Sequence, residues 1–220
     1  MIRYVFIVLC IAAPLALADS STSRVNGSIH VAPSEQHGDV STVNGAIRID
    51  ADAEAADVRT VNGSITLGER AVARSVRTVN GSITLRSGAR VSGGVRTVNG
   101  SISLGEEATA GSLSNVNGTI RLDRAHVRGD VETVSGDIDV GAGSRIDGGI
   151  TIHKPSGGWF RWRERTPRVV VGPEAVVSGT LRFEREVELY VSDRARIGPV
   201  QGAEAIRFPG ERPPEHQRVL

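Results

Sequence analysis

The chain has 220 residues, of which 26 are basic and 25 acidic, so its formal net charge at neutral pH is +1. This balance excludes the strong positive field that draws proteins to nucleic acids, and no nucleic-acid partner is expected. With 26 glycines but only 2 Trp, 2 Tyr and 4 Phe, the composition also excludes a large aromatic core and favours a thin one of Val, Ile and Leu.

The first 18 residues have the pattern of a secretory signal peptide. Arg3 supplies a positive charge, an apolar run over residues 4–13 follows, and Ala16-Leu17-Ala18 resembles a cleavage site. We therefore predict that residues 1–18 are a signal peptide and that the protein is exported, either periplasmic or associated with the cell envelope. An uncleaved membrane anchor is the alternative. Cleavage would remove Cys10, the single cysteine, so no disulfide is expected.

A sequence repeat dominates residues 19–152, which we predict to be regular solenoid coils. The tripeptide Val-Asn-Gly begins at positions 25, 43, 61, 79, 98 and 116, and the variant Val-Ser-Gly begins at 134. Successive copies are 18 residues apart except for one spacing of 19, between Val79 and Val98. Similarity at a fixed period indicates a repeat architecture in which each unit packs on its neighbours.

Each unit contains one turn signal and one short strand. Asn-Gly favours the positive φ values of a sharp turn, and the residues 64–67 alternate polar and apolar like a half-buried strand. A series of β-hairpins is the alternative, but hairpins need two patterned strands per turn. We therefore predict an all-β fold, a single-stranded parallel β-helix (β-solenoid) with about 18 residues per coil. The spacing leaves its handedness open.

Stacked coils place like residues in columns. Ile65, Ile83 and Ile102 should line one continuous interior column. The asparagines of the repeat should form a structural turn ladder, either as an inward column joined by hydrogen bonds or as residues selected for positive φ. These asparagines are Asn26, Asn44, Asn62, Asn80, Asn99 and Asn117.

The regular pattern ends after residue 152. Residues 153–168 are predicted to be an insertion loop rich in aromatic and basic residues. Its centre is a candidate interaction loop, because clustered Trp and Arg are typical of interface anchors and of membrane-surface contacts; packing back onto the solenoid is the alternative. This centre consists of Trp159, Phe160, Arg161, Trp162 and Arg163. We expect irregular coils and a cap over residues 169–208, and a disordered tail over 209–220.

The repeated Thr-Val-Asn-Gly-Ser-Ile motif, over about residues 24–140, resembles a family of bacterial envelope proteins of unknown function that are built from short β-strand repeats and described as adhesins. The segment from Gly172 to Gly179 resembles the coils of bactofilins, which are polymer-forming cytoskeletal proteins. These resemblances imply a β-solenoid that either polymerises or adheres to a surface. Neither supplies catalytic residues.

Few residues suggest chemistry. Asp130, Asp137, Asp139 and Asp147 fall in successive predicted coils and would suit a carbohydrate-active β-helix enzyme, but aspartate beside glycine is also common in turns. The five histidines lack the spacing of metal ligands, so no metal, cofactor or catalytic residue is expected.

Arg59, Arg77 and Arg96 share one phase of the repeat and should stack as a basic column, either solvated or bound to an anionic glycan. We expect a non-catalytic exported structural β-solenoid that self-associates end to end in the cell envelope. An adhesin-like module that binds a glycan, an envelope protein or a membrane surface is the first alternative, and the carbohydrate-active enzyme is the second.

Overall fold

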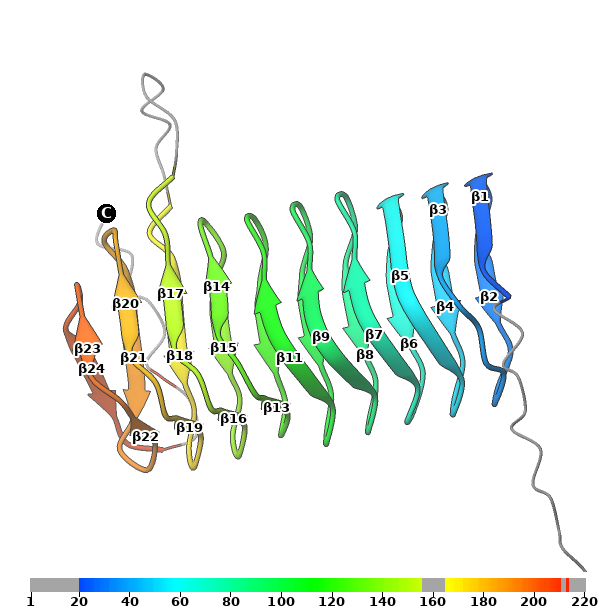
Figure 1. The fold of residues 1–220 in the computed structure, drawn as a ribbon. Helices are drawn as coiled ribbons and strands as arrows, with labels where there is room; N and C mark the ends of the chain where they lie inside the picture. The colour runs from blue at the N-terminus through cyan, green and yellow to red at the C-terminus, as the bar shows by residue number, and fades with distance from the viewer. Residues whose placement is uncertain (1–19, 156–164, 211–212, 214–220) are drawn as a thin grey trace, which may run out of the picture.

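The computed structural model describes residues 20–155, 165–210 and 213. The predicted signal peptide and most of the predicted tail lie outside these residues. The described chain forms 24 strands and winds into coils that lie side by side from one end of the rod to the other (Figure 1). The strands of successive coils pair in parallel, which confirms the predicted all-β solenoid. No helix in the described ranges is long and apolar enough to cross a membrane.

Two parallel sheets run along the rod. The smaller has 10 strands, one from each coil: β2 (Ile29–Val31), β4 (Ile47–Ile49), β6 (Ile65–Leu67), β8 (Ile83–Leu85), β10 (Ile102–Leu104), β12 (Ile120–Leu122), β15 (Ile138–Val140), β18 (Arg168–Val171), β21 (Glu188–Ser192) and β24 (Ala205–Phe208).

The larger sheet has 14 strands, because from β13 onward each coil contributes two short strands in place of one long bent strand. Its members are β1 (Thr22–Asn26), β3 (Val40–Asn44), β5 (Glu54–Asn62), β7 (Val72–Arg77), β9 (Arg90–Arg96), β11 (Thr109–Ser114), β13 (His126–Val127), β14 (Val131–Thr133), β16 (Arg145–Ile146), β17 (Ile150–Ile152), β19 (Val176–Val177), β20 (Leu181–Phe183), β22 (Arg196–Ile197) and β23 (Val200–Gln201).

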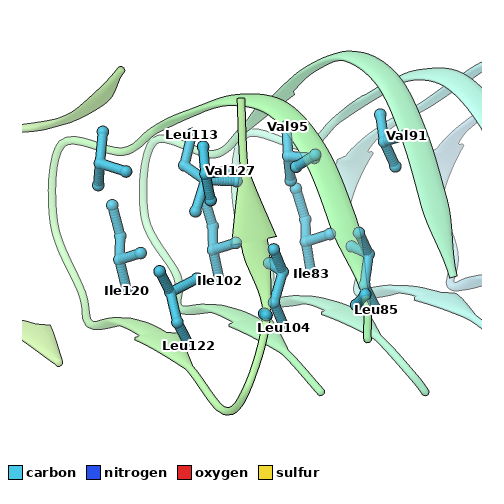
Figure 2. Close-up of a cluster of buried hydrophobic side chains, with 14 of the residues drawn as sticks. Ile83, Leu85, Val91, Val95, Ile102, Leu104, Leu113, Ile120, Leu122 and Val127 are labelled. Atoms are coloured by element: carbon cyan, nitrogen blue, oxygen red, sulfur yellow. The ribbon is translucent and has the colours of Figure 1, made fainter. Parts of the chain in front are cut away.

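Successive coils align residue on residue. Ile65 pairs with Ile83, and Ile83 pairs with Ile102, so the predicted interior column is confirmed. Figure 2 shows Ile83, Ile102 and Ile120 in line, one from each of three neighbouring coils. All of these isoleucines are fully buried. Burial of such a side chain stabilises the fold by about 1.5–3 kcal/mol.

Six positions in each regular coil point inward, and from β4 to β12 one or two of them carry alanine. In the coil that starts at β6, the inward side chains are at most 1% exposed; they are Ile65, Leu67, Ala71, Ala73, Val76 and Thr78. The pair from β6 and the pair Val76 and Thr78 are larger, whereas the pair between them is alanine. The core is therefore thin on one side, as expected for a chain with so few aromatic residues.

One inward position departs from a strict six-residue spacing. That spacing would place Arg128 in the column of Ala73, three coils later, but Val127 occupies the position, paired with Ala110, and Arg128 is exposed. The reason is a shorter turn: two residues separate the buried Leu122 from the buried Ala125, where three separate Leu67 from Ala71.

Larger side chains fill the C-terminal coils. Phe183 continues the inward column that holds Thr133 and Ile152. Tyr190 is buried, and the guanidinium of Arg168 lies 4.7 Å from the centre of its ring. In the last strand, β24, Phe208 is 2% exposed. Phe183 extends the core where the repeat is least regular, whereas Tyr190 alternates with the inward Leu189 and Val191 and is buried outside the core.

The Asn-Gly turns stack so tightly that a side chain on the glycine has no room. A Cβ on Gly63 would lie 2.0 Å from the carbonyl oxygen of Gly45 in the preceding coil. We expect Gly63→Ala to lower the free energy of unfolding by about 1–3 kcal/mol. The neighbouring exposed control, Ser64→Ala, should change it by less than about 0.5 kcal/mol. Urea denaturation followed by circular dichroism measures both, and equal stabilities would contradict the tight stacking.

Candidate functional site

The exposed part of the repeat is concentrated at the corner where each coil passes from the larger sheet to the smaller one. Strand β5 ends with Arg59-Thr60-Val61-Asn62, and β6 begins at Ile65 after the turn. Thr60 points inward, whereas Arg59, Val61 and Asn62 are exposed. Because the coils are in register, each of these residues becomes a column along the rod.

The six asparagines form a continuous ladder of hydrogen bonds. Each one after Asn26 donates from Nδ2 to Oδ1 of the asparagine one coil earlier, over 2.9–3.0 Å. Their side chains are exposed, so the ladder runs along the outside of the rod, not along the inside. None of the six is among the described residues with positive φ; Gly27, Gly81 and Gly118 take that conformation in three of the turns.

A buried threonine supports four of the turns from within. Thr60 Oγ1 donates to the carbonyl oxygen of Gly45 at 3.0 Å, and Thr78 Oγ1 donates in the same way to Gly63. The bond satisfies a turn carbonyl that the neighbouring strands leave unpaired. These threonines were not among the residues predicted to have a role. The signal was present, because a threonine sits at an inward phase between Arg and Val in unit after unit.

Exposed valines form a ridge beside the asparagine ladder. Their exposed fractions range from 36% to 67%. Single exposed apolar residues are common on proteins, but a contiguous apolar surface marks a site of interaction. We call this column the valine ridge; its members are Val25, Val43, Val61, Val79, Val98 and Val116.

The predicted arginine column lies two residues before the valine ridge. Arg59 pairs in register with Arg77, and Arg77 with Arg96. Ser41 and Ser114 continue the column on either side. A hollow of about 330 Å³ opens here, lined by the three arginines together with Ser75, Val76 and Gly94.

Asp57 anchors one side of this region. Its carboxylate accepts hydrogen bonds from Arg74 Nε at 3.0 Å, from Ser75 Oγ at 2.7 Å and from Arg59 Nη2 at 2.6 Å. The bond from Arg74 and then that from Ser75 are the main causes that lower the pKa of Asp57 to about 2. Asp57 is therefore ionised at neutral pH and compensates the charge of Arg59.

The four aspartates considered as catalytic candidates make structural contacts. Asp137 accepts from Arg165 Nη2 at 2.7 Å and from the backbone of Arg168 at 2.9 Å. Asp139 pairs with Arg121, and Asp130 accepts from the backbone of Gly149 at 2.8 Å.

Asp147 has two basic partners. His126 Nε2 lies 2.7 Å from its Oδ2, and Arg145 binds its other oxygen. The hydrogen bond to His126, followed by that from Arg145, lowers the pKa of Asp147. Among the described residues, no group of His, Cys, Asp and Glu is placed to hold a metal ion.

The candidate interaction loop falls on residues that the structure does not describe. Trp159, Phe160, Arg161, Trp162 and Arg163 all lie in the undescribed range 156–164. The described residues on both sides of that range are held in place.

Before the range, the backbone of Lys154 donates to Glu184 Oε2 at 3.1 Å, and this bond is the main cause that lowers the pKa of Glu184. After it, Arg165 binds Asp137 as described above.

Comparisons with protein-family models, with curated proteins and with solved structures found no match. The resemblances to envelope repeat proteins and to bactofilins therefore stay predictions.

The asparagine ladder predicts a graded loss of stability. Asn80 takes part in two ladder bonds, to Asn62 and from Asn99, whereas Asn117 takes part in one. Since an exposed hydrogen bond contributes about 0.5–1.5 kcal/mol, Asn80→Ala should destabilise the rod about twice as much as Asn117→Ala. Urea denaturation of the two variants measures the ratio, and equal losses would show that the ladder bonds contribute little.

The lowered pKa of Asp57 predicts a pH-dependent contribution to stability. A depressed carboxyl pKa stabilises the folded state above its ordinary value of 3.8, and the contribution disappears as the pH falls from about 4 to about 2. At pH 7, Asp57→Asn should therefore be less stable than the wild type by about 2 kcal/mol. The difference should vanish near pH 2 in denaturant titrations at each pH. A difference that does not depend on pH would contradict the assignment.

Proposed function

We propose that this chain is a non-catalytic, exported structural β-solenoid of the cell envelope, a rigid rod that holds a partner along its side. The observation that carries the proposal is the repetition of exposed side chains at constant phase. The valine ridge and the asparagine ladder run in parallel over six successive coils of one corner. Such columns present the same contact many times, which suits a partner that is itself extended.

The aspartates support a structural function. Each of the four acids that a glycan-cleaving site would use is bound to an arginine, a histidine or a backbone amide. In this proposal their role is to hold turns and the flanks of the insertion, a common use of aspartate at turns. Export is proposed from the pattern of residues 1–18, and the envelope location follows from it.

The ends of the rod favour binding along the side over end-to-end assembly. In the first coil, Arg24 stands at the phase of the buried Thr42. In the last coil, Arg207 stands at the phase of the buried Val191 and is exposed. Charged residues at inward positions protect sheet edges from pairing with other chains.

Further polar residues close the N-terminal coil. In the first coil, Glu35 and His37 occupy the positions that the buried Ala53 and Ala55 occupy in the next coil. The two ring nitrogens of His37 lie 3.1 Å from the carbonyl oxygen of Ser20 and 3.3 Å from Glu35 Oε2. An incoming coil would have to displace these contacts. We therefore propose that the rod acts as a separate unit, in contrast to the end-to-end association expected from the sequence.

Light scattering combined with size-exclusion chromatography tests this proposal on the exported chain. The wild type should have the mass of one chain at every concentration. The double variant R24T/R207V gives each end of the rod the residue that the adjacent coil has at the same phase. It should therefore form oligomers whose mass increases with protein concentration. The control R86T/R90T removes two exposed charges from the sides and should behave as the wild type. Concentration-dependent filaments of the wild type would overturn the proposal in favour of end-to-end assembly.

A second measurement tests export. Intact-mass analysis of the chain in a periplasmic fraction should give a polypeptide that begins at Asp19. Retention of the full chain in the cytoplasm would contradict the envelope location.

A further inference from the structure

The hollow over the arginine column differs in charge from the surface around it. Asp57 binds Arg59, with 2.6 Å between Arg59 Nη2 and Asp57 Oδ2. By contrast, neither Arg77 nor Arg96 makes a hydrogen bond or ion pair to another side chain in the part of the chain that the structure describes. The two guanidinium groups belong to neighbouring strands, whose spacing is ~4.8 Å. Two positive charges are thus held side by side, and their guanidinium N–H groups bind no other side chain among the described residues.

A β-bulge shapes this hollow. Ala73 pairs with Val91 and Val76 with Val95, so β9 has one residue more than β7 between the paired positions. This is the place where the repeat is 19 residues long in place of 18. The extra residue falls in Ser92-Gly93-Gly94. A bulge redirects the side chains beside it and is often found next to a functional site.

Gly94 leaves room over the bulge. A Cβ at this position would lie 3.2 Å from Ser112 Oγ and 3.4 Å from Arg96 Nε. Glycine therefore lets the Arg96 side chain lie close to the strand and keeps the hollow open between Arg96 and Ser75. The only coil with an extra residue in the regular part of the rod thus lies beside two arginines that have no acidic partner among the described residues.

We propose that this hollow binds an anionic group of an acidic polysaccharide, a linear glycan that carries carboxylate or sulfate groups. Guanidinium forks match the two oxygens of such groups, and Arg77 and Arg96 offer two forks in a row. Val79 and Val98 of the valine ridge follow the two arginines by two residues and are 36% and 39% exposed. They give an apolar surface on which the C–H face of a sugar ring can pack. This inference rests on the proposed function, since it names the partner held along the side.

The charge pattern favours a glycan over a nucleic acid. Ser41 and Ser114 bound the arginine column, so its positive charge extends over only two uncompensated residues. Nucleic-acid binding uses many cations spread over a groove or face.

A second hollow, of about 470 Å³, lies over Thr84 and Ser103 of the smaller sheet. It is lined by Glu69, Glu106 and Asp123 as well as by Arg86, Arg121 and Arg124, and therefore selects neither sign of charge.

Binding of polygalacturonate to the full exported chain tests the inference, by biolayer interferometry at low and at high salt. The wild type should bind polygalacturonate, and neutral dextran should not bind. The double variant R77Q/R96Q should weaken binding by about tenfold or more, because it removes both forks. The matched control R86Q/R90Q removes the same charge from two other exposed positions of the coil that holds Arg96, and it should change affinity by less than about twofold.

Three outcomes would overturn the inference. The first is that the wild type does not bind polygalacturonate. The second is that both double variants lose the same affinity for it. The third is that the wild type binds single-stranded DNA more tightly than polygalacturonate and that R77Q/R96Q weakens DNA binding to the same extent. Circular dichroism of R77Q/R96Q verifies that the variant folds. None of these results bears on the mass of the chain in light scattering, so a failure of this inference is distinguishable from a failure of the proposed function.

Discussion

The parallel hydrogen bonding between neighbouring coils is the constraint from which the other features follow. Each strand binds the same strand one unit later, so a residue type at a given phase meets its own kind above and below. Inward phases then become continuous columns of Ile, Leu, Val and Ala, and outward phases become columns of Asn, Val and Arg. A coil contributes little core alone, and its stability comes from its two neighbours. The side of the rod is therefore a repetitive surface by construction.

Because most positions repeat from coil to coil, the residues that differ from their column are the ones with a role of their own. In a column of identical side chains, function is most visible where the column changes. The arginine column is such a place, because Asp57 compensates Arg59 while the next two arginines have no acidic partner in the described coils. The bulge at Gly93-Gly94 falls beside these same two residues. Charge and backbone irregularity thus point to one position on an otherwise uniform rod.

Much of the fold could be predicted from the sequence, because period and phase are local properties of the chain. The Val-Asn-Gly spacing gave the coil length, and the alternation in Ser64-Ile65-Thr66-Leu67 identified the strand whose isoleucine lines the core. The phase of the asparagines was harder. Their direction depends on how sharply the chain bends between Thr60 and Ile65, and the structure places them outside. The same limit applies to Arg128, since the loss of one turn residue after Leu122 shifts the next inward positions by one until an extra residue before Val131 restores the spacing of 18.

The candidate site was only partly predictable. Stacking of Arg59, Arg77 and Arg96 followed from their common phase, and the ion pair of Arg59 with Asp57 is local, because the two residues are two positions apart in β5. The roles of Asp137 and Asp147 depend on partners that lie 28 and 21 residues away in the chain. The repeat identifies residues that lie one or more whole coils apart at the same position. It does not identify these partners, because they lie at different positions in different coils.

The turn geometry has a consequence for how such a gene can change in length. Side chains alternate between the two faces of a strand, so a single-codon deletion inside β6 or β8 would turn buried residues toward solvent. The corners are different: the chain tolerates one extra residue at the bulge before Val95 and one fewer after Leu122 while the neighbouring columns stay aligned. Loss or duplication of a whole unit would preserve every phase at once. Over evolutionary time, rods of this type should therefore vary mainly in their number of coils and in the identity of corner residues, with the strands between the corners kept at constant length.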